Sequence, residues 1–342
     1  MIGDKIYFYT EDGTKFYSKL EAIEYSKKNN QKLSFYFYDD VYSKVDWKKE
    51  LKEDLSYYYK QQALRLREKY DYLILAYSGG YDSTNILETF VYNNIKLDKI
   101  IVVGAFSKDS EWGVDENHNG EIYHNAIPYL EQLGLMNITE VIDYTKYLKD
   151  EAFKELSVYK LGPKWVYEIG SFFSVHNFFW RDAEKIITPK EWSEKKVGFI
   201  LGLDKPQINQ ISEIEDKSIF SFTDAPVILY GNSRGYQNTE RVRFYWDPDY
   251  TDLLIKQIQH LKSNNCFGPN QKTSASFLYD LKNPLKFNSP KTGNVFWSLR
   301  DTYLSNEKNT ELFQFYKSGL EELDRVVGFA SVVPVESRQY EI

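Results

Sequence analysis

Six consecutive residues combine the side chains and the backbone freedom that phosphate binding requires. They are Ser78-Gly79-Gly80-Tyr81-Asp82-Ser83, and they follow an apolar run and precede a helical pattern. Glycines let the backbone approach a ligand and adopt positive φ, and the amides at the start of a helix point at a bound anion. The two serines add hydroxyl donors. This segment therefore predicts a site for a phosphate-bearing ligand.

The carboxylate in this segment suggests that the ligand carries a metal ion. A carboxylate such as Asp82 repels a phosphate unless a cation lies between them, and Mg²⁺ prefers oxygen ligands. The segment thus predicts a magnesium–phosphate ligand. A purely structural interpretation also exists, in which the glycines form a tight strand-to-helix turn and Asp82 or Ser83 caps the helix.

A second candidate segment lies at the carboxyl end of another apolar run, Val197–Leu203. It reads Gly202-Leu203-Asp204-Lys205-Pro206. Ligands of open α/β sheets bind beyond the carboxyl ends of the strands, so this segment is expected near the first one. Lys205 would stabilise negative charge that develops during reaction, and Asp204 would bind Mg²⁺. The alternative is an ordinary polar turn with a solvated lysine.

A third segment, Gly231-Asn232-Ser233-Arg234-Gly235, has the spacing of the nucleophile elbow of serine hydrolases. That elbow requires a helix directly after it, and the residues that follow read as a turn and a strand. The only later histidine is His260, too close in sequence for a catalytic triad. We therefore interpret this segment as a hairpin turn.

The remaining polar residues give weaker signals. The histidines at 118, 124 and 176 lack the spacing of metal ligands, and the acidic segment 107–120 is either a lid over a ligand or a solvated loop. In the stretch Phe244–Asp249 we expect Trp246 to belong to the core and Asp247-Pro248 to cap the next helix.

The apolar runs are short and alternate with helical patterns. Strands are expected at 72–77, 99–106, 138–142 and 197–203, and helices at 83–94, 121–133 and 168–184. This alternation predicts an α/β fold with a doubly wound, mostly parallel sheet.

The chain on either side of this region has a different pattern. Before it we expect strands at 6–10 and 33–38 and helices at 18–29 and 45–69. After it we expect a hairpin from 218–223 and 227–230, a strand at 241–246, and helices at 251–263 and 311–326. The predicted organisation is an α/β appendage with a helix (1–60), a nucleotide-binding domain (61–210) and an α+β extension (211–342).

The segment Ser78-Gly79-Gly80-Tyr81-Asp82-Ser83 resembles the SGGxDS pyrophosphate loop of the PP-loop superfamily, the N-type ATP pyrophosphatases. The resemblance covers about residues 70–210 and implies an adenine nucleotide α-hydrolase-like fold that cleaves ATP between its α- and β-phosphates. Ser78, Gly79, Gly80, Asp82 and Ser83 would then hold pyrophosphate and Mg²⁺. The backbone of Val103-Gly104-Ala105-Phe106 would pair with the adenine edge, and Lys205 would contact the phosphates. No G-x-x-x-x-G-K-[ST] segment is present, so a Walker-type site is not expected.

Departures from individual branches of the superfamily narrow the expected activity. The single cysteine, Cys266, argues against sulfur transfer and against a cysteine zinc site, and residue 2 is Ile2, so no N-terminal glutaminase nucleophile is present. The chain also resembles phage-encoded PP-loop proteins that combine SGGYDS, GLDKP and FYWDPD. The turn GLDKP differs from the one in asparagine synthetases, which puts aspartate as a substrate in doubt.

The resemblance therefore implies an AMP- and pyrophosphate-forming ligase that activates a carboxylate or carbonyl of a small substrate. The attacking amine or ammonia would come from a separate donor. A non-catalytic adenine-nucleotide-binding module and a nucleoside- or tRNA-modifying enzyme are the alternatives.

The composition limits the classes of partner. With 43 basic and 50 acidic residues the net charge is −7, which disfavours sequence-independent binding to nucleic acid, although an RNA substrate stays open. No stretch has the ~18 consecutive apolar residues of a membrane helix, and the start of the chain does not have a signal-peptide pattern. We therefore expect a cytoplasmic protein without a membrane partner.

Overall fold

The computed structural model describes residues 6–104, 121–147, 152–167, 176–202, 207–212, 217–221, 238–264, 311–327 and 340–341. Its centre is a five-stranded sheet in the spatial order β10-β7-β4-β5-β6, with every neighbouring pair parallel. The strands are β4 (Tyr72–Ala76), β5 (Lys99–Gly104), β6 (Thr139–Asp143), β7 (Val197–Leu201) and β10 (Thr239–Arg243). The predicted α/β class with a parallel sheet is confirmed.

The order of the strands reverses beside β4. From β4 the chain continues outward through β5 and β6 on one side, and β7 and β10 follow on the other side. Such a reversal is the point at which open α/β sheets bind ligands, beyond the carboxyl ends of the strands. The glycine-rich segment that follows β4 therefore lies at this switch point.

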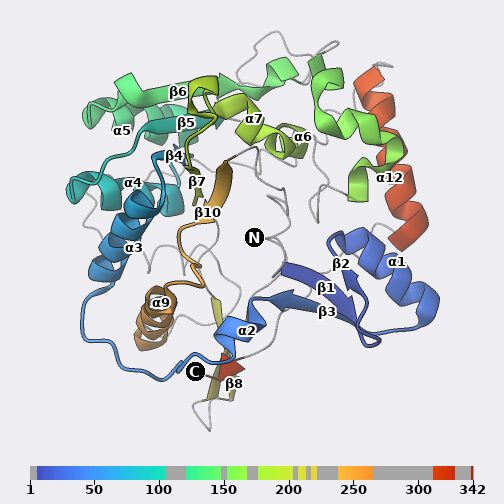
Figure 1. The fold of residues 1–342 in the computed structure, drawn as a ribbon, viewed down its shortest axis with the longest axis horizontal. Helices are drawn as coiled ribbons and strands as arrows, with labels where there is room; N and C mark the ends of the chain where they lie inside the picture. Colours follow the sequence, from blue (N-terminus) through green and yellow to red (C-terminus); the bar gives the residue numbers. More distant parts are fainter. Residues whose placement is uncertain are drawn as a thin grey trace.

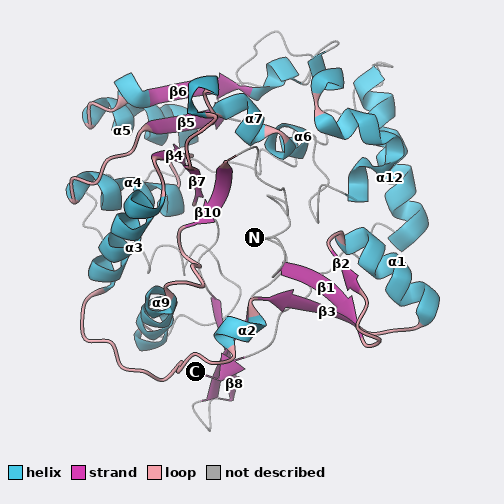
Figure 2. Cartoon of the chain, viewed as in Figure 1, coloured by secondary structure: helices cyan, strands magenta, loops and turns pink. Residues whose placement is uncertain are grey.

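Helices cover both faces of the parallel sheet, as Figures 1 and 2 show. On one face Leu73 and Leu75 of β4 belong to a core shared with α3 (Leu55–Lys69), α4 (Tyr81–Tyr92), α5 (Ile127–Gln132) and α9 (Thr251–Ser263). On the other face Ile74 packs in a core with α6 (His176–Arg181), α7 (Ala183–Ile187), η7 (Ser157–Tyr167) and α12 (Glu311–Val327). A strand buried on both faces needs a continuous apolar sequence, which explains the runs at 72–77 and 197–203.

The N-terminal residues form a small antiparallel sheet, in the order β2-β1-β3, with one helix. Its elements are β1 (Ile6–Thr10), β2 (Lys15–Phe16), α1 (Lys19–Asn29) and β3 (Leu33–Phe37). Phe8 of β1 lies opposite Phe35 of β3, and both rings belong to the same core as α3 and α9. The short helix α2 (Asp39–Tyr42) follows after Tyr38, a non-glycine residue with φ of 51°. Aromatic packing thus joins this sheet to the rest of the chain.

Two helices differ from the sequence expectation. The helix expected over 45–69 begins only at Leu55, because Trp47 is buried and donates a 3.2 Å hydrogen bond to the carbonyl of Tyr42, which holds the preceding chain in a non-helical path. The helix expected over 121–133 begins with a π-helical turn, η3 (Ile122–Ala126), before α5. Of the helix expected over 168–184, residues 168–175 lie outside the described ranges and the remainder forms α6 and α7.

The first strand of the expected hairpin pairs with other strands than the sequence predicts. Strand β9 (Lys217–Ser221) pairs antiparallel with β8 (Gln207–Ser212), which precedes it, and β11 (Tyr340–Glu341) adds to its other side. Residues 227–230, the expected partner, are outside the described part. Pairing with the preceding strand requires only a four-residue connection, the kind of short link that hairpins favour.

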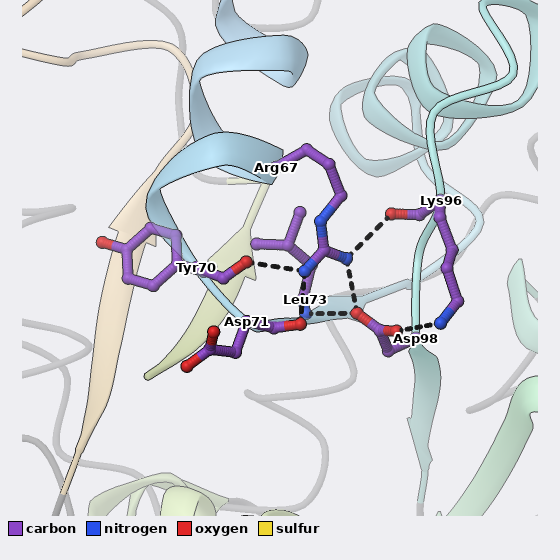
Figure 3. A network of polar contacts seen from close by, with 6 residues as sticks. All are labelled: Arg67, Tyr70, Asp71, Leu73, Lys96 and Asp98. Carbon is purple, nitrogen blue, oxygen red and sulfur yellow. Dashed lines mark hydrogen bonds and ion pairs between the residues drawn. The ribbon is translucent and has the colours of Figure 1, made fainter. Parts of the chain in front are cut away.

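A polar network fixes the amino end of β4, opposite to the glycine segment (Figure 3). Asp98 accepts hydrogen bonds from Arg67 at 2.5 Å and from the amide of Leu73 at 2.9 Å, and it forms an ion pair with Lys96 at 2.6 Å. Burial raises the pKa of Asp98, but the bonds from Lys96, Arg67 and Leu73 outweigh it, so the net pKa lies below its usual value. The network ties α3 to the starts of β4 and β5.

None of the helices in the described ranges has both the length and the apolar character needed to cross a membrane.

Candidate functional site

The glycine segment forms a tight turn between β4 and α4. The amide of Tyr77 bonds to the carbonyl of Ile101 at 2.8 Å, so the backbone pairing with β5 extends one residue past the end of β4. Gly79 then has φ of +81°, and a β-carbon there would lie 2.8 Å from the backbone nitrogen of Ala126. Only glycine fits this position, on both conformational and steric grounds.

The two serines of the segment close the turn. Their hydroxyl oxygens lie 3.0 Å apart, and the amide of Gly80 donates to the hydroxyl of Ser78 at 3.3 Å. Ser83 is buried and its hydroxyl donates to the carbonyl of Gly80 at 3.2 Å, whereas Ser78 is exposed. The hydroxyls are thus held at the start of α4, where the helix dipole favours an anion.

Asp82 lies in the first turn of α4, and a distant residue holds its backbone. The hydroxyl of Tyr245 donates a 2.7 Å hydrogen bond to the carbonyl of Asp82 and accepts one from the side-chain amide of Asn85 at 3.0 Å. Gln257 of α9 donates to the carbonyl of Tyr245 at 3.0 Å. Tyr245 is only 1% exposed. Its hydroxyl therefore couples the start of α4 to α9.

Sequence reasoning assigned the stretch around Tyr245 to the core and to a helix cap. The core assignment is confirmed, because Trp246 is buried. The cap is wrong: α9 begins after Tyr250 without a side-chain cap, and Asp247 instead accepts hydrogen bonds from the amide of Asp249 at 2.9 Å and from Gln62 at 3.1 Å. The role of the Tyr245 hydroxyl depends on a contact across 163 residues, which no local pattern signals.

A second carboxylate lies beside the turn, and the sequence did not single it out. The carboxylate oxygens of Glu121 would lie 3.7 and 3.8 Å from a β-carbon placed on Gly80, and its backbone oxygen 3.0 Å from one on Gly79. Glu121 directly precedes η3, and π-helical turns are frequent at functional sites. Together with Asp82 it places oxygen ligands of the kind that Mg²⁺ prefers around the turn.

The end of β5, for which the sequence predicts an adenine contact, lies at the same edge of the sheet as the glycine turn. Its ladder with β4 ends at Ile101, opposite Ala76, whereas its ladder with β6 continues to Gly104, opposite Asp143. Val103 and Gly104 therefore extend beyond the pairing with β4, at the same edge as the glycine turn. Ala105 and Phe106 are outside the described residues.

The end of β7 lies against the same turn. A β-carbon on Gly202 would lie 3.0 Å from the amide nitrogen of Ser83. Gly202 begins the second candidate segment, so that segment starts in contact with the first, as expected from parallel strands. Its remaining residues, 203–206, which include Asp204 and Lys205, lie outside the described part of the chain.

The other candidate residues lie partly beyond what the structure describes. The segment 231–235, the polar segment 107–120 with His118, and Cys266 are outside it. His124 is exposed on η3. Among the described residues no group of three or more His, Cys, Asp or Glu side chains is arranged to hold a metal ion. Two shallow surface depressions, one between α2 and α9 and one between α3 and α4, include no residue of the glycine turn.

Comparison of this chain with protein-family models, with curated proteins and with solved structures gave no match. The functional conclusion therefore depends on the residues and their geometry.

Proposed function

We propose that this chain is a magnesium- and ATP-dependent enzyme that forms AMP and pyrophosphate, with a doubly wound nucleotide-binding sheet of the PP-loop type. The observation that carries the proposal is the place of the segment Ser78–Ser83. It follows the strand beside which the strand order reverses, and it opens α4 with a glycine at φ of +81°. Phosphates bind at such a helix start in open α/β sheets.

The residues at the turn suit a magnesium–triphosphate ligand. The hydroxyls of Ser78 and Ser83 and the amides that begin α4 are donors for phosphate oxygens. The carboxylates of Asp82 and Glu121 would repel a bare phosphate, but they are suitable ligands for a magnesium ion that it carries. Bound Mg²⁺ would supply neutralisation of charge on the departing pyrophosphate.

The proposed reaction has two steps. An oxygen of the acceptor carboxylate attacks the α-phosphorus of ATP, the bond from this phosphorus to the bridging oxygen breaks, and pyrophosphate leaves with the electron pair. An amine then attacks the acyl carbon of the mixed anhydride, loses a proton, and AMP departs. In the first step Ser78 and Ser83 hold the pyrophosphate group, and Lys205 stabilises the charge that grows on it.

The order of the strands supports a division of the sheet edge between the adenine, the phosphates and the acceptor. The end of β5 would bind adenine, the turn after β4 would bind the phosphates, and the ends of β7 and β10 would face the acceptor. This arrangement follows the order of the strands.

The products formed from ATP test the proposed function. The protein is incubated with ATP, Mg²⁺ and panels of carboxylic acids, with hydroxylamine as a general nucleophile that traps activated acyl groups as hydroxamates. We expect AMP and pyrophosphate in equal amounts by phosphorus NMR. Gly79→Ala should abolish release, and Gly134→Ala, at another positive-φ glycine with nothing within 4 Å of its β-carbon position, is the matched control. ADP as the main product would refute the proposal. Tight ATP binding without pyrophosphate release would indicate a nucleotide-binding module instead.

A further inference from the structure

Two arginines on the same face of β10 have very different surroundings. Arg241 is paired: its guanidinium forms a two-pronged ion pair with Glu184 of α7, with one prong at 2.8 Å, and it donates to the carbonyl of Trp180 at 2.6 Å. This is the geometry that a buried guanidinium needs to compensate for its lost hydration.

Arg243, two residues further along the strand, has no such partner. Its side chain is partly buried, and its Nε atom is fully buried without a hydrogen-bond partner. Within the described chain, no carboxylate forms an ion pair with it. Burial lowers the pKa of Arg243, so the folded protein carries this charge at a cost in free energy. Within the described residues the guanidinium of Arg243 is therefore unpaired, and its charge is available to an incoming anion.

The position of Arg243 places it at the ligand-binding edge. It is the last residue of β10 and lies opposite Leu201, which lies opposite Ala76, the last residue of β4 before the glycine turn. Two strand spacings of about 4.8 Å separate the backbones of Arg243 and Ala76. Arg243 is therefore close to the phosphate site but on the side away from β5.

Two tyrosines that follow the N-terminal sheet, Tyr38 after β3 and Tyr42 at the end of α2, lie near Arg243. Burial raises the pKa of Tyr38 to about 12, and the charge of Arg243 acts against this rise, so the two groups lie close together. The hydroxyl of Tyr42 also interacts with the charge of Arg243. Tyr38 adopts φ of 51°, a conformation that is strained for a bulky residue and is found at sites where the surrounding structure imposes it.

We propose that Arg243 binds a carboxylate of the acceptor substrate, a second one besides the group that becomes activated. The acceptor class is therefore a small dicarboxylate or amino dicarboxylate, with aspartate the member that the turn GLDKP disfavours. The role of this ligand as the acceptor depends on the proposed function. The existence of the anion site depends only on the position and contacts of Arg243. Guanidinium binds carboxylate through two parallel hydrogen bonds, and the β10 side of the sheet is opposite to the expected adenine contact.

The first test compares the stabilities of variants without any ligand. Arg241→Gln removes a paired guanidinium and leaves Glu184 buried, so it should lower the melting temperature clearly. Arg243→Gln removes a charge that no carboxylate of the described residues pairs with, so it should leave the melting temperature unchanged or raise it. If Arg243→Gln lowers the melting temperature as much as Arg241→Gln does, then Arg243 is structural and the inference is wrong.

The second test measures ligand binding. Malonate, succinate, glutarate, aspartate and glutamate are compared with succinamate, asparagine and glutamine by thermal shift, without ATP. At least one diacid should raise the melting temperature more than its half-amide does. Its affinity should fall at least tenfold in Arg243→Gln and less in Arg243→Lys, which keeps the charge without the planar fork. Arg325→Gln, at an exposed arginine paired with Glu322, is the matched control. The inference fails if no diacid stabilises the wild type, or if Arg243→Gln responds as the wild type does.

The two proposals fail separately. If pyrophosphate release depends on an acceptor but Arg243→Gln leaves its KM unchanged, the inference about Arg243 is wrong and the proposed function stands. If diacids stabilise the protein through Arg243 but no condition releases pyrophosphate, the anion site stands and the proposed function is wrong.

Discussion

The hydroxyl of Tyr245 donates a 2.7 Å hydrogen bond to the backbone carbonyl of Asp82, across 163 residues of sequence. This bond connects the chain that leaves β10 to the first turn of α4, which carries the proposed phosphate donors. The position of the glycine turn therefore depends on the C-terminal part of the sheet as well as on its own sequence.

Tyr245→Phe tests this connection. The variant loses the bond to Asp82 and leaves the buried amide of Asn85 without its acceptor, so we expect a loss of about 1–3 kcal/mol in unfolding free energy. We also expect weaker binding of magnesium-ATP, because the start of α4 is less firmly held. Chemical denaturation and calorimetry measure the two effects. Tyr25→Phe, which removes an exposed bond to Asp12, should change neither. Unchanged ATP affinity in a destabilised Tyr245→Phe would limit the hydroxyl to a structural role.

Gly79→Ala tests the geometry of the turn. Alanine at φ of +81° is strained, and its β-carbon would lie 2.8 Å from the backbone of Ala126. We expect a loss of ATP binding and a destabilisation well above the ~1–2 kcal/mol of left-handed strain alone. Gly134→Ala shows the effect of strain without the clash, because nothing lies within 4 Å of its β-carbon position. Equal effects of the two variants on ATP binding would contradict the assignment of the turn.

Asp82→Asn and Lys205→Ala should separate binding from chemistry. Asp82→Asn should weaken binding of magnesium-ATP and leave metal-free AMP binding nearly unchanged. If the proposed function is right, Lys205→Ala should lower kcat by ~10²–10³-fold with little change in KM, because it would remove a contact that strengthens only as pyrophosphate leaves. Steady-state kinetics of both variants measures the effects on binding and on the chemical step, and circular dichroism checks that the variants are folded. A wild-type kcat in Lys205→Ala would remove this residue from the site.

Asp98 gives a pH dependence of stability. Its pKa in the folded protein is below the ordinary value of 3.8, so its contribution is fully present above that value and is lost as the pH falls through the folded pKa. Asp98→Asn should cost about 1–3 kcal/mol at pH 7 and should flatten the decline of stability below pH 4. Denaturation at several pH values measures both effects. ATP affinity should not change, because this network lies at the amino ends of β4 and β5, whereas the glycine turn follows the carboxyl end of β4. An unaltered pH profile in Asp98→Asn would show that other carboxylates dominate.

The parts of the fold that the sequence predicts are those with a local signal. Strands β4 and β7 are continuous apolar runs because both of their faces are buried, and the glycine turn is a contiguous segment. The π-helical turn beside Glu121 has no such signal, since its composition matches an ordinary helix. The late start of α3 depends on the burial of Trp47.

The parts of the site that the sequence does not predict come from distant residues. Tyr245 and Arg243 belong to a stretch, 241–246, that the sequence predicts only as a strand, and the pairing of β10 with β7 brings them to the glycine turn. Arg241 and Arg243 have the same residue type and face the same side of the strand. The contrast between them depends on Glu184, a residue of another element, so it becomes visible only in three dimensions.

The pairing of β10 with β7 also has a consequence for how the protein must be produced. During synthesis the sheet stays incomplete until residue 243 has left the ribosome. Until then β7, whose five residues are all buried in the finished protein, presents an open edge. A recombinant fragment that stops near residue 210 would keep that edge permanently, and we expect it to precipitate. A fragment that extends through α9, to residue 264, would retain the fifth strand and the Tyr245 contact, but it would lose α12, whose Tyr316 stacks on Trp165 in the core of the other face. The full chain is therefore the form to express.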